Sequence, residues 1–141
     1  MKRIVPKDAL KNIDLSGDGK IDGVILKYVN VLAPLEFEKE LDLDDLKKQL
    51  ADAEAKIGDL AVDFKKVTII FGEERVTYDD MEKIRGRTVP VGSAIFLYYP
   101  VDGGIPEGSH KIYLKTVYQG QANETELQRD LAGVMDKSEL K

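Results

Sequence analysis

The second half of the chain is a series of short runs rich in β-branched and aromatic residues, separated by turn signals, and this pattern constrains the fold most strongly. Gly72 and Glu73 separate the first two runs, which predicts a hairpin. Residues 94–99 are apolar at nearly every position, so we expect a central strand that is covered on both faces. Ile112 and Leu114 alternate with polar or charged neighbours, which predicts one wet face in the last strand. The expected strands span residues 66–71, 74–78, 87–91, 93–99 and 110–118.

The first half combines extended chain with one helix. Residues 23–32 are rich in Val and Ile and predict a strand, and residues 35–38 predict a second extended piece. Apolar residues then recur every three or four positions, which places them on one side of a helix over residues 43–57. Asp42 is the expected N-cap and Gly58 the stop signal. The apolar stripe consists of Leu43, Leu46, Leu50, Ala53, Ile57 and Leu60.

Two shorter helices are expected in the remainder. Residues 79–82 resemble a capping box that opens a short helix, and Gly86 ends it. Residues 123–126 form a similar cap, after which apolar residues lie on one helical face and predict a C-terminal helix that packs back on its own domain. That face consists of Leu127, Leu131, Val134 and Met135.

Six or seven strands with closely spaced turns favour a mostly-β fold, an immunoglobulin-like β-sandwich with an inserted helix over 43–57 and a C-terminal helix. With 141 residues, the chain is expected to form a single domain, 1–141. The alternative is an α+β domain in which the helix over 43–57 packs on one antiparallel sheet.

Residues 103–114 resemble the late hairpin of many immunoglobulin-like domains, where a Pro-x-Gly turn leads into a strand of alternating apolar residues. The stretch from Val67 to Tyr118 is distantly similar to the small immunoglobulin-like subunit of bacterial C-glycoside deglycosidases. This resemblance rests on strand order and a few turn residues, without a diagnostic motif. It implies a non-catalytic accessory subunit.

Residues 14–22 place oxygen-bearing side chains on every second residue around a tight glycine turn. In a calcium-binding loop, Asp14, Ser16, Asp18 and Asp22 would occupy positions 1, 3, 5 and 9, and Lys20 would offer its backbone carbonyl at position 7. A hard cation needs several oxygens converging on one point, and this alternation supplies them from one short segment.

Position 12, where an EF-hand has a bidentate Glu, is Ile25, and strand-forming residues follow it. The first half of the loop resembles a dockerin loop. The whole loop more closely resembles the calcium loops of FG-GAP repeats, in which the Asp at position 9 completes the site and a strand follows. The resemblance covers residues 14–22 and implies a metal rather than a fold.

The same residues also fit a polar turn without a metal, because Asp-Gly is a strong turn dipeptide and Asp and Ser side chains bond their own backbone in turns. If the loop does hold Ca²⁺, three carboxylates without a bidentate acid predict weak binding, with a Kd of about 10⁻⁴ to 10⁻³ M. Such a Ca²⁺ ion would be structural.

Composition limits the partners. A net charge of −5 argues against nucleic acid or an anionic membrane as the main partner, because both need a basic face. No apolar run reaches the length of a membrane span, so no membrane insertion is expected. The absence of a leader-like segment favours a cytoplasmic protein, whereas a weak calcium loop favours an extracellular one whose leader has been removed, and the compartment stays open.

The sequence favours a protein that is not an enzyme. The chain has one histidine, His110, and no cysteine, so no triad or thiol nucleophile can be assembled, and a histidine at a strand edge is typical of a surface or turn position. Tyr98, Tyr99, Tyr113 and Tyr118 lie on two strands expected to be neighbours, and an aromatic face of this kind can bind sugars or peptides or simply pack in the core.

These patterns predict a non-catalytic binding or structural module with a calcium-stabilised N-terminal loop and a protein or carbohydrate partner. The alternative is a non-catalytic accessory subunit of a larger enzyme, with the aromatic strands or the C-terminal helix as its contact surface.

Overall fold

The computed structural model describes residues 3–4, 8–30, 35–40, 42–72, 74–118 and 120–140. Its largest element is a seven-stranded sheet with the order β13-β2-β3-β10-β7-β8, in which β1 pairs with β3 off this path. All pairs are antiparallel except β13 with β2. The strands are β1 (Arg3–Ile4), β2 (Leu10–Ile13), β3 (Gly23–Asn30), β7 (Thr68–Phe71), β8 (Glu74–Val76), β10 (Ala94–Pro100) and β13 (Val134–Met135).

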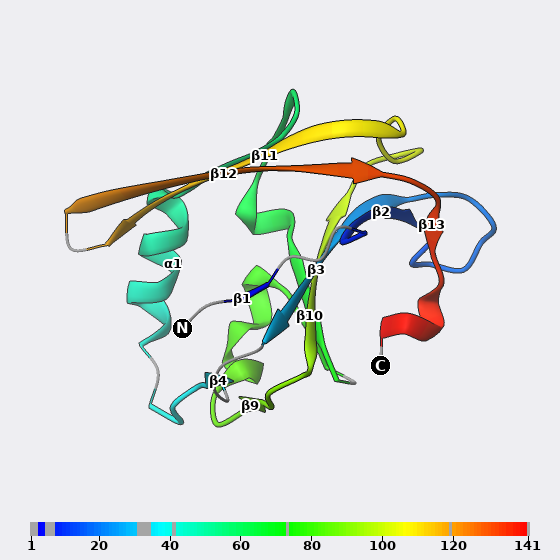
Figure 1. The fold of residues 1–141 in the computed structure, drawn as a ribbon. Coiled ribbons are helices and arrows are strands. Elements are labelled where there is room, and N and C mark those ends of the chain that lie inside the picture. The colour runs from blue at the N-terminus through cyan, green and yellow to red at the C-terminus, as the bar shows by residue number, and fades with distance from the viewer. Residues whose placement is uncertain are drawn as a thin grey trace.

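A four-stranded sheet with the order β12-β11-β5-β6 covers part of the large sheet. Its long β11–β12 hairpin runs across the top of Figure 1 and reaches α1 on the left. A further pair, β4–β9, lies at the opposite end of the molecule. These elements are β4 (Leu35–Glu36), α1 (Leu43–Asp52), β5 (Glu54–Ile57), β6 (Leu60–Val62), β9 (Thr88–Val89), β11 (Gly108–Tyr118), β12 (Gln121–Leu131) and the 3₁₀ helices η1 (Phe64–Lys66), η2 (Tyr78–Ile84) and η3 (Lys137–Leu140).

The expected mostly-β fold is confirmed, since two sheets pack in the manner of a β-sandwich. The hairpin at Gly72 and the central position of β10 between β3 and β7 are also confirmed. The finer immunoglobulin-like assignment stays a prediction. Among the described residues, the model contains no helix that is both long enough and apolar enough to cross a membrane.

Three apolar clusters hold the layers together. The first lies between the two sheets and joins Leu10, Val24 and Leu26 to Ile112 and Leu131. The second lies on the other face of the large sheet, where Met135 and Leu140 from the C-terminal segment cover strand residues such as Ile25 and Phe96. In the third, η2 and α1 pack near the β7–β8 end of the large sheet. The alternation of β3 and β10 residues between these clusters follows from the two-residue period of a strand.

The inserted helix is shorter than predicted. Asp42 caps α1 as expected, because its carboxylate accepts a hydrogen bond from the Asp45 N–H at 3.1 Å. The helix ends at Asp52 rather than at residue 57, and Glu54–Ile57 form β5 instead. Ile57 keeps its core-facing position, but it reaches the core from a strand that pairs with β11. Gly58, with φ 60°, serves the β5–β6 turn rather than a helix end.

The predicted C-terminal helix is wrong. Residues 121–131 form β12, which pairs with β11 over its whole length, and Val134–Met135 form β13. Gly120, with φ 78°, supplies the left-handed conformation of the turn that starts this hairpin. Leu127 and Leu131 lie four residues apart, which suits one face of a strand as well as one face of a helix, so long-range pairing decided the outcome.

The short helix expected from residue 79 is the 3₁₀ helix η2, and it begins one residue earlier. Its capping box joins Thr77 to Asp80 rather than Asp79 to Glu82. Gly86, with φ 74°, follows it as expected.

The apolar stripe of α1 contacts the third cluster, but every residue of the helix keeps some exposure to solvent. Leu50→Ala should therefore lower the free energy of unfolding by about 1–2 kcal/mol, less than the cost at a sealed core position. Urea denaturation measures this value. Lys48→Ala on the exposed side of the same helix is the control and should change it by less than about 0.5 kcal/mol. A loss near zero would mean that α1 does not pack on the sheet.

Candidate functional site

The acidic loop at residues 14–22 joins β2 to β3 and is closed by its own carboxylates. The Asp14 carboxylate accepts hydrogen bonds from the backbone N–H groups of Gly17 and Gly19, each at 2.8 Å, and from the Ser16 hydroxyl at 3.2 Å. Asp18 accepts from the Lys20 N–H at 2.9 Å. Gly17 and Gly19 have φ values of 83° and 88°, which explains why glycine occupies both positions.

Asp22 connects the loop to the large sheet. Its carboxylate accepts from the N–H groups of Leu15 and Ser16, at 3.0 and 2.9 Å. The Tyr98 hydroxyl lies 3.0 Å from the same carboxylate and 3.1 Å from the backbone carbonyl of Asp22. Gly23 allows the tyrosine ring to come this close, because a Cβ at this position would lie 2.5 Å from Tyr98 Cε1. The loop is thus anchored on a central strand.

These contacts change the pKa values of the groups involved. Desolvation raises the pKa of Asp22, but the hydrogen bonds from Ser16, Leu15 and Tyr98 together outweigh it and bring this pKa below its ordinary 3.8. The pKa of Asp14 is also lowered, because the N–H groups of Gly19 and Gly17 outweigh desolvation. Desolvation and the Asp22 carboxylate raise the pKa of Tyr98 to about 12, so its hydroxyl stays protonated and donates.

The structure does not gather the predicted calcium ligands around one point. Within the described residues, which include all of 14–22, no three acidic, histidine or cysteine side chains form a group that could hold a metal ion. The carboxylates of Asp14 and Asp22 instead point their oxygens at backbone N–H groups. In this arrangement the carboxylates are engaged within the loop, and the calcium site stays a prediction.

The Asp22 network makes stability depend on acid. Because the folded-state pKa of Asp22 is lowered, its contribution is present above the unfolded value of 3.8 and is lost as pH falls through the folded value. Asp22→Asn should cost about 1–3 kcal/mol at pH 7, since one carbonyl oxygen cannot replace two acceptors. It should also flatten the loss of stability between about pH 5 and pH 2.

Urea denaturation across this pH range tests both expectations. Asp18→Asn, which changes an exposed acid with one backbone bond, is the matched control and should change the free energy of unfolding by less than about 0.5 kcal/mol. Equal effects of the two substitutions would contradict the anchoring role of Asp22.

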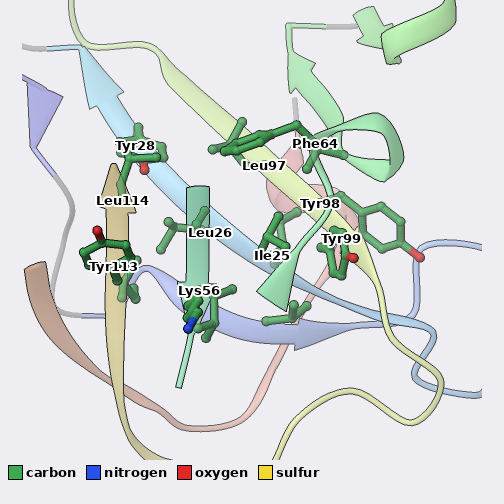
Figure 2. A pocket seen from close by; sticks show the side chains of 16 residues that line it. Ile25, Leu26, Tyr28, Lys56, Phe64, Leu97, Tyr98, Tyr99, Tyr113 and Leu114 are labelled. Carbon is green, nitrogen blue, oxygen red and sulfur yellow. The ribbon is translucent and has the colours of Figure 1, made fainter. Parts of the chain in front are cut away.

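A cavity between the two sheets has a volume of about 140 Å³. Leu26 and Tyr28 of β3 and Leu97 and Tyr99 of β10 form one wall, as Figure 2 shows. Residues of the small sheet and of η1 form the other walls. They are Ala55, Lys56, Ile57, Val62, Phe64, Ile112, Tyr113 and Leu114. Polar atoms are scarce in this lining, and the only charged group among the described lining residues is the exposed Lys56.

The predicted tyrosines do not form one aromatic face. Tyr98 and Tyr99 lie on the large sheet and Tyr113 lies on the small one, so their strands belong to opposing layers rather than to neighbouring positions. Tyr98, Tyr99 and Tyr113 nevertheless all line the cavity between the sheets, and Tyr98 also packs with the cluster on the other side of the large sheet. Tyr118 ends β11, and its side chain lies outside the described residues.

Tyr28 is a pocket residue that the sequence analysis did not single out. It follows Val24 and Leu26 at a spacing of two along β3, so strand alternation was the available signal. The Tyr99 hydroxyl is fixed by a bond from the Asp63 N–H at 3.1 Å. His110 lies at the surface end of β11, where its Nε2 is 2.6 Å from the Pro106 carbonyl, as expected for a turn position.

Comparison with models of protein families and with curated proteins finds no match to this chain. The site is therefore interpreted from its own geometry.

Proposed function

We propose that the chain is a non-catalytic binding module whose ligand site is the cavity between the two sheets. The supporting observation is that this cavity, of about 140 Å³, is lined by aliphatic and aromatic side chains and lies where a sandwich is normally filled. Close-packed interiors have few voids larger than a water molecule. An apolar void of this size favours an apolar guest, because water there would lack hydrogen-bond partners.

The chemistry of the lining supports binding rather than catalysis. Its described residues include no Asp, Glu, His or Cys, so no paired acid and base face the cavity. Apolar cavities of about 150 Å³ are large enough for benzene. The ligand, or the part of it that enters the cavity, is therefore a small hydrocarbon or aromatic group.

The calcium-stabilised loop remains part of this proposal as a structural element. It is supported by the two-residue spacing of Asp14, Ser16, Asp18, Lys20 and Asp22. The ion would offset repulsion among the three carboxylates.

Calcium at about 10 mM should raise the melting temperature, because an ion that binds the folded loop stabilises it by mass action. Asp18→Ala should abolish the rise, since it removes a central ligand. Magnesium at the same concentration is the control. If calcium changes neither the melting temperature nor the NMR resonances of residues 14–22, the loop is a polar turn.

An accessory subunit remains the second candidate, with a different contact surface from the predicted one. In the described sheets β12 pairs on one side with β11, and the side chains of residues 121–126 are all exposed. A strand edge of this kind can accept a strand from a partner. Co-purification with a stable partner that is released by Thr125→Pro would favour this candidate.

Benzene titration followed by NMR tests the binding proposal. Ala55 faces the cavity, and Ala55→Phe should fill the cavity and weaken binding at least about tenfold. Ala61→Phe is the matched control, because Ala61 is exposed on the neighbouring strand and does not line the cavity. No binding to the unmodified protein, or equal binding by both variants, would overturn the proposal.

A further inference from the structure

The cavity between the sheets adjoins two others at Phe64. The second cavity, of about 170 Å³, lies beneath α1 and η2 and shares Phe64, Val67 and Leu97 with the first. The third, of about 230 Å³, lies by the end of α1 and shares Leu50, Phe64 and Tyr78 with the second. Phe64 lines all three spaces, so they are neighbours that share this ring as a common wall.

Phe64, which lines all three cavities, belongs to a very short helix. This is the three-residue helix η1, which Asp63 caps by accepting the Lys65 N–H at 3.0 Å. No residue of η1 is fully buried. The phenyl ring is therefore a partition held by one turn of chain, and Figure 2 shows it beside Leu97 at the edge of the first cavity.

The polarity of the lining differs among the three cavities. The first two are lined almost wholly by apolar atoms, whereas the third includes the charged residues Asp63 and Lys65. Lys47 of α1 lies with Nζ 4.9 Å from the ring centre of Tyr78, which lines the second and third cavities. Neither lysine has an acidic partner in the part of the chain that the structure describes. The Asp63 carboxylate, in contrast, is engaged by the cap of η1.

We propose that the three cavities form one site for a single-chain amphiphile with a carboxylate head, of the fatty-acid class. This inference rests on the proposed function and extends it. The hydrocarbon chain occupies the first two cavities, which join when the Phe64 ring turns aside. The carboxylate lies in the third cavity, where Lys65 supplies positive charge at the wall and Lys47 adds to it from beside the Tyr78 ring. An apolar tail and a charged head match the two kinds of lining, and burial of the tail supplies the affinity.

Calorimetry with hexanoate and decanoate, both below their micellar concentrations, tests the continuity of the site. Each buried methylene should tighten binding by about fourfold, so decanoate, with four more methylenes, should bind about 250-fold more tightly than hexanoate. Ile69 lines the second cavity but not the first, and Ile69→Phe should fill that space. In this variant the advantage of decanoate should fall below about fivefold, while benzene binding in the first cavity is unchanged.

Charge substitutions test the position of the head. Lys65→Glu should weaken decanoate at least about tenfold and should leave decyltrimethylammonium binding unweakened. Lys66→Glu is the matched control, since Lys66 is exposed on the same helix and lines none of the three cavities, and it should change decanoate affinity by less than about twofold. Thermal melting of each variant establishes that it is folded.

The outcomes separate the two proposals. If benzene binds in the first cavity but decanoate is no tighter than hexanoate, the binding module stands and the extended site is wrong. If Lys65→Glu and Lys66→Glu weaken decanoate equally, the position assigned to the carboxylate is wrong. If neither benzene nor decanoate binds, both proposals fall.

Discussion

The pairing of β3 with β10 is the interaction on which the rest of the structure depends. These strands pair antiparallel over seven residues of β10 at the centre of the large sheet, with Leu97 opposite Leu26. Successive residues face opposite layers, so Leu26 packs toward the small sheet while Ile25 packs toward the C-terminal segment. The small sheet, α1 and the C-terminal segment each cover part of one of these two apolar faces.

The two faces are covered to different degrees. The C-terminal segment seals its face with Met135 and Leu140, both nearly inaccessible to solvent. On the other face, the small sheet and α1 cover different areas and meet above η1. Leu50 and Phe64 at this meeting point are half-buried. The hollow is therefore a consequence of architecture, because two covers that meet over a three-residue turn leave space beneath their junction.

Local signals were sufficient where the structure is local. The Asp42 cap and the Gly72 hairpin both depend on neighbouring residues, and the sequence predicted them. The helix predicted for residues 123–135 failed because Leu127 and Leu131 fit either period, and pairing with β11 favoured the strand. The same limit applies to residues 53–57, where pairing of β5 with β11 ended the helix early.

The candidate sites show the same division. The loop at residues 14–22 was located from its spacing, but which donors its carboxylates meet depends on the backbone fold and on Tyr98, a residue 76 positions away from Asp22. The cavity could not be predicted from the sequence, because it depends on how the two sheets and α1 pack against each other. The sequence predicts that the tyrosines lie on neighbouring strands, but the sheet pairing places Tyr99 and Tyr113 on opposing sheets.

The central claim is that the space between the sheets admits an apolar ligand, and methyl NMR tests it most directly. With benzene added, the account predicts selective chemical-shift changes and ligand-to-methyl nuclear Overhauser effects at Leu26, Ile57, Leu97 and Leu114, which line the cavity. Methyl groups of Ile13 and Ile70, in the sealed cluster on the other face, should not respond. Equal responses from both groups of methyls, or none from the first, would contradict the account.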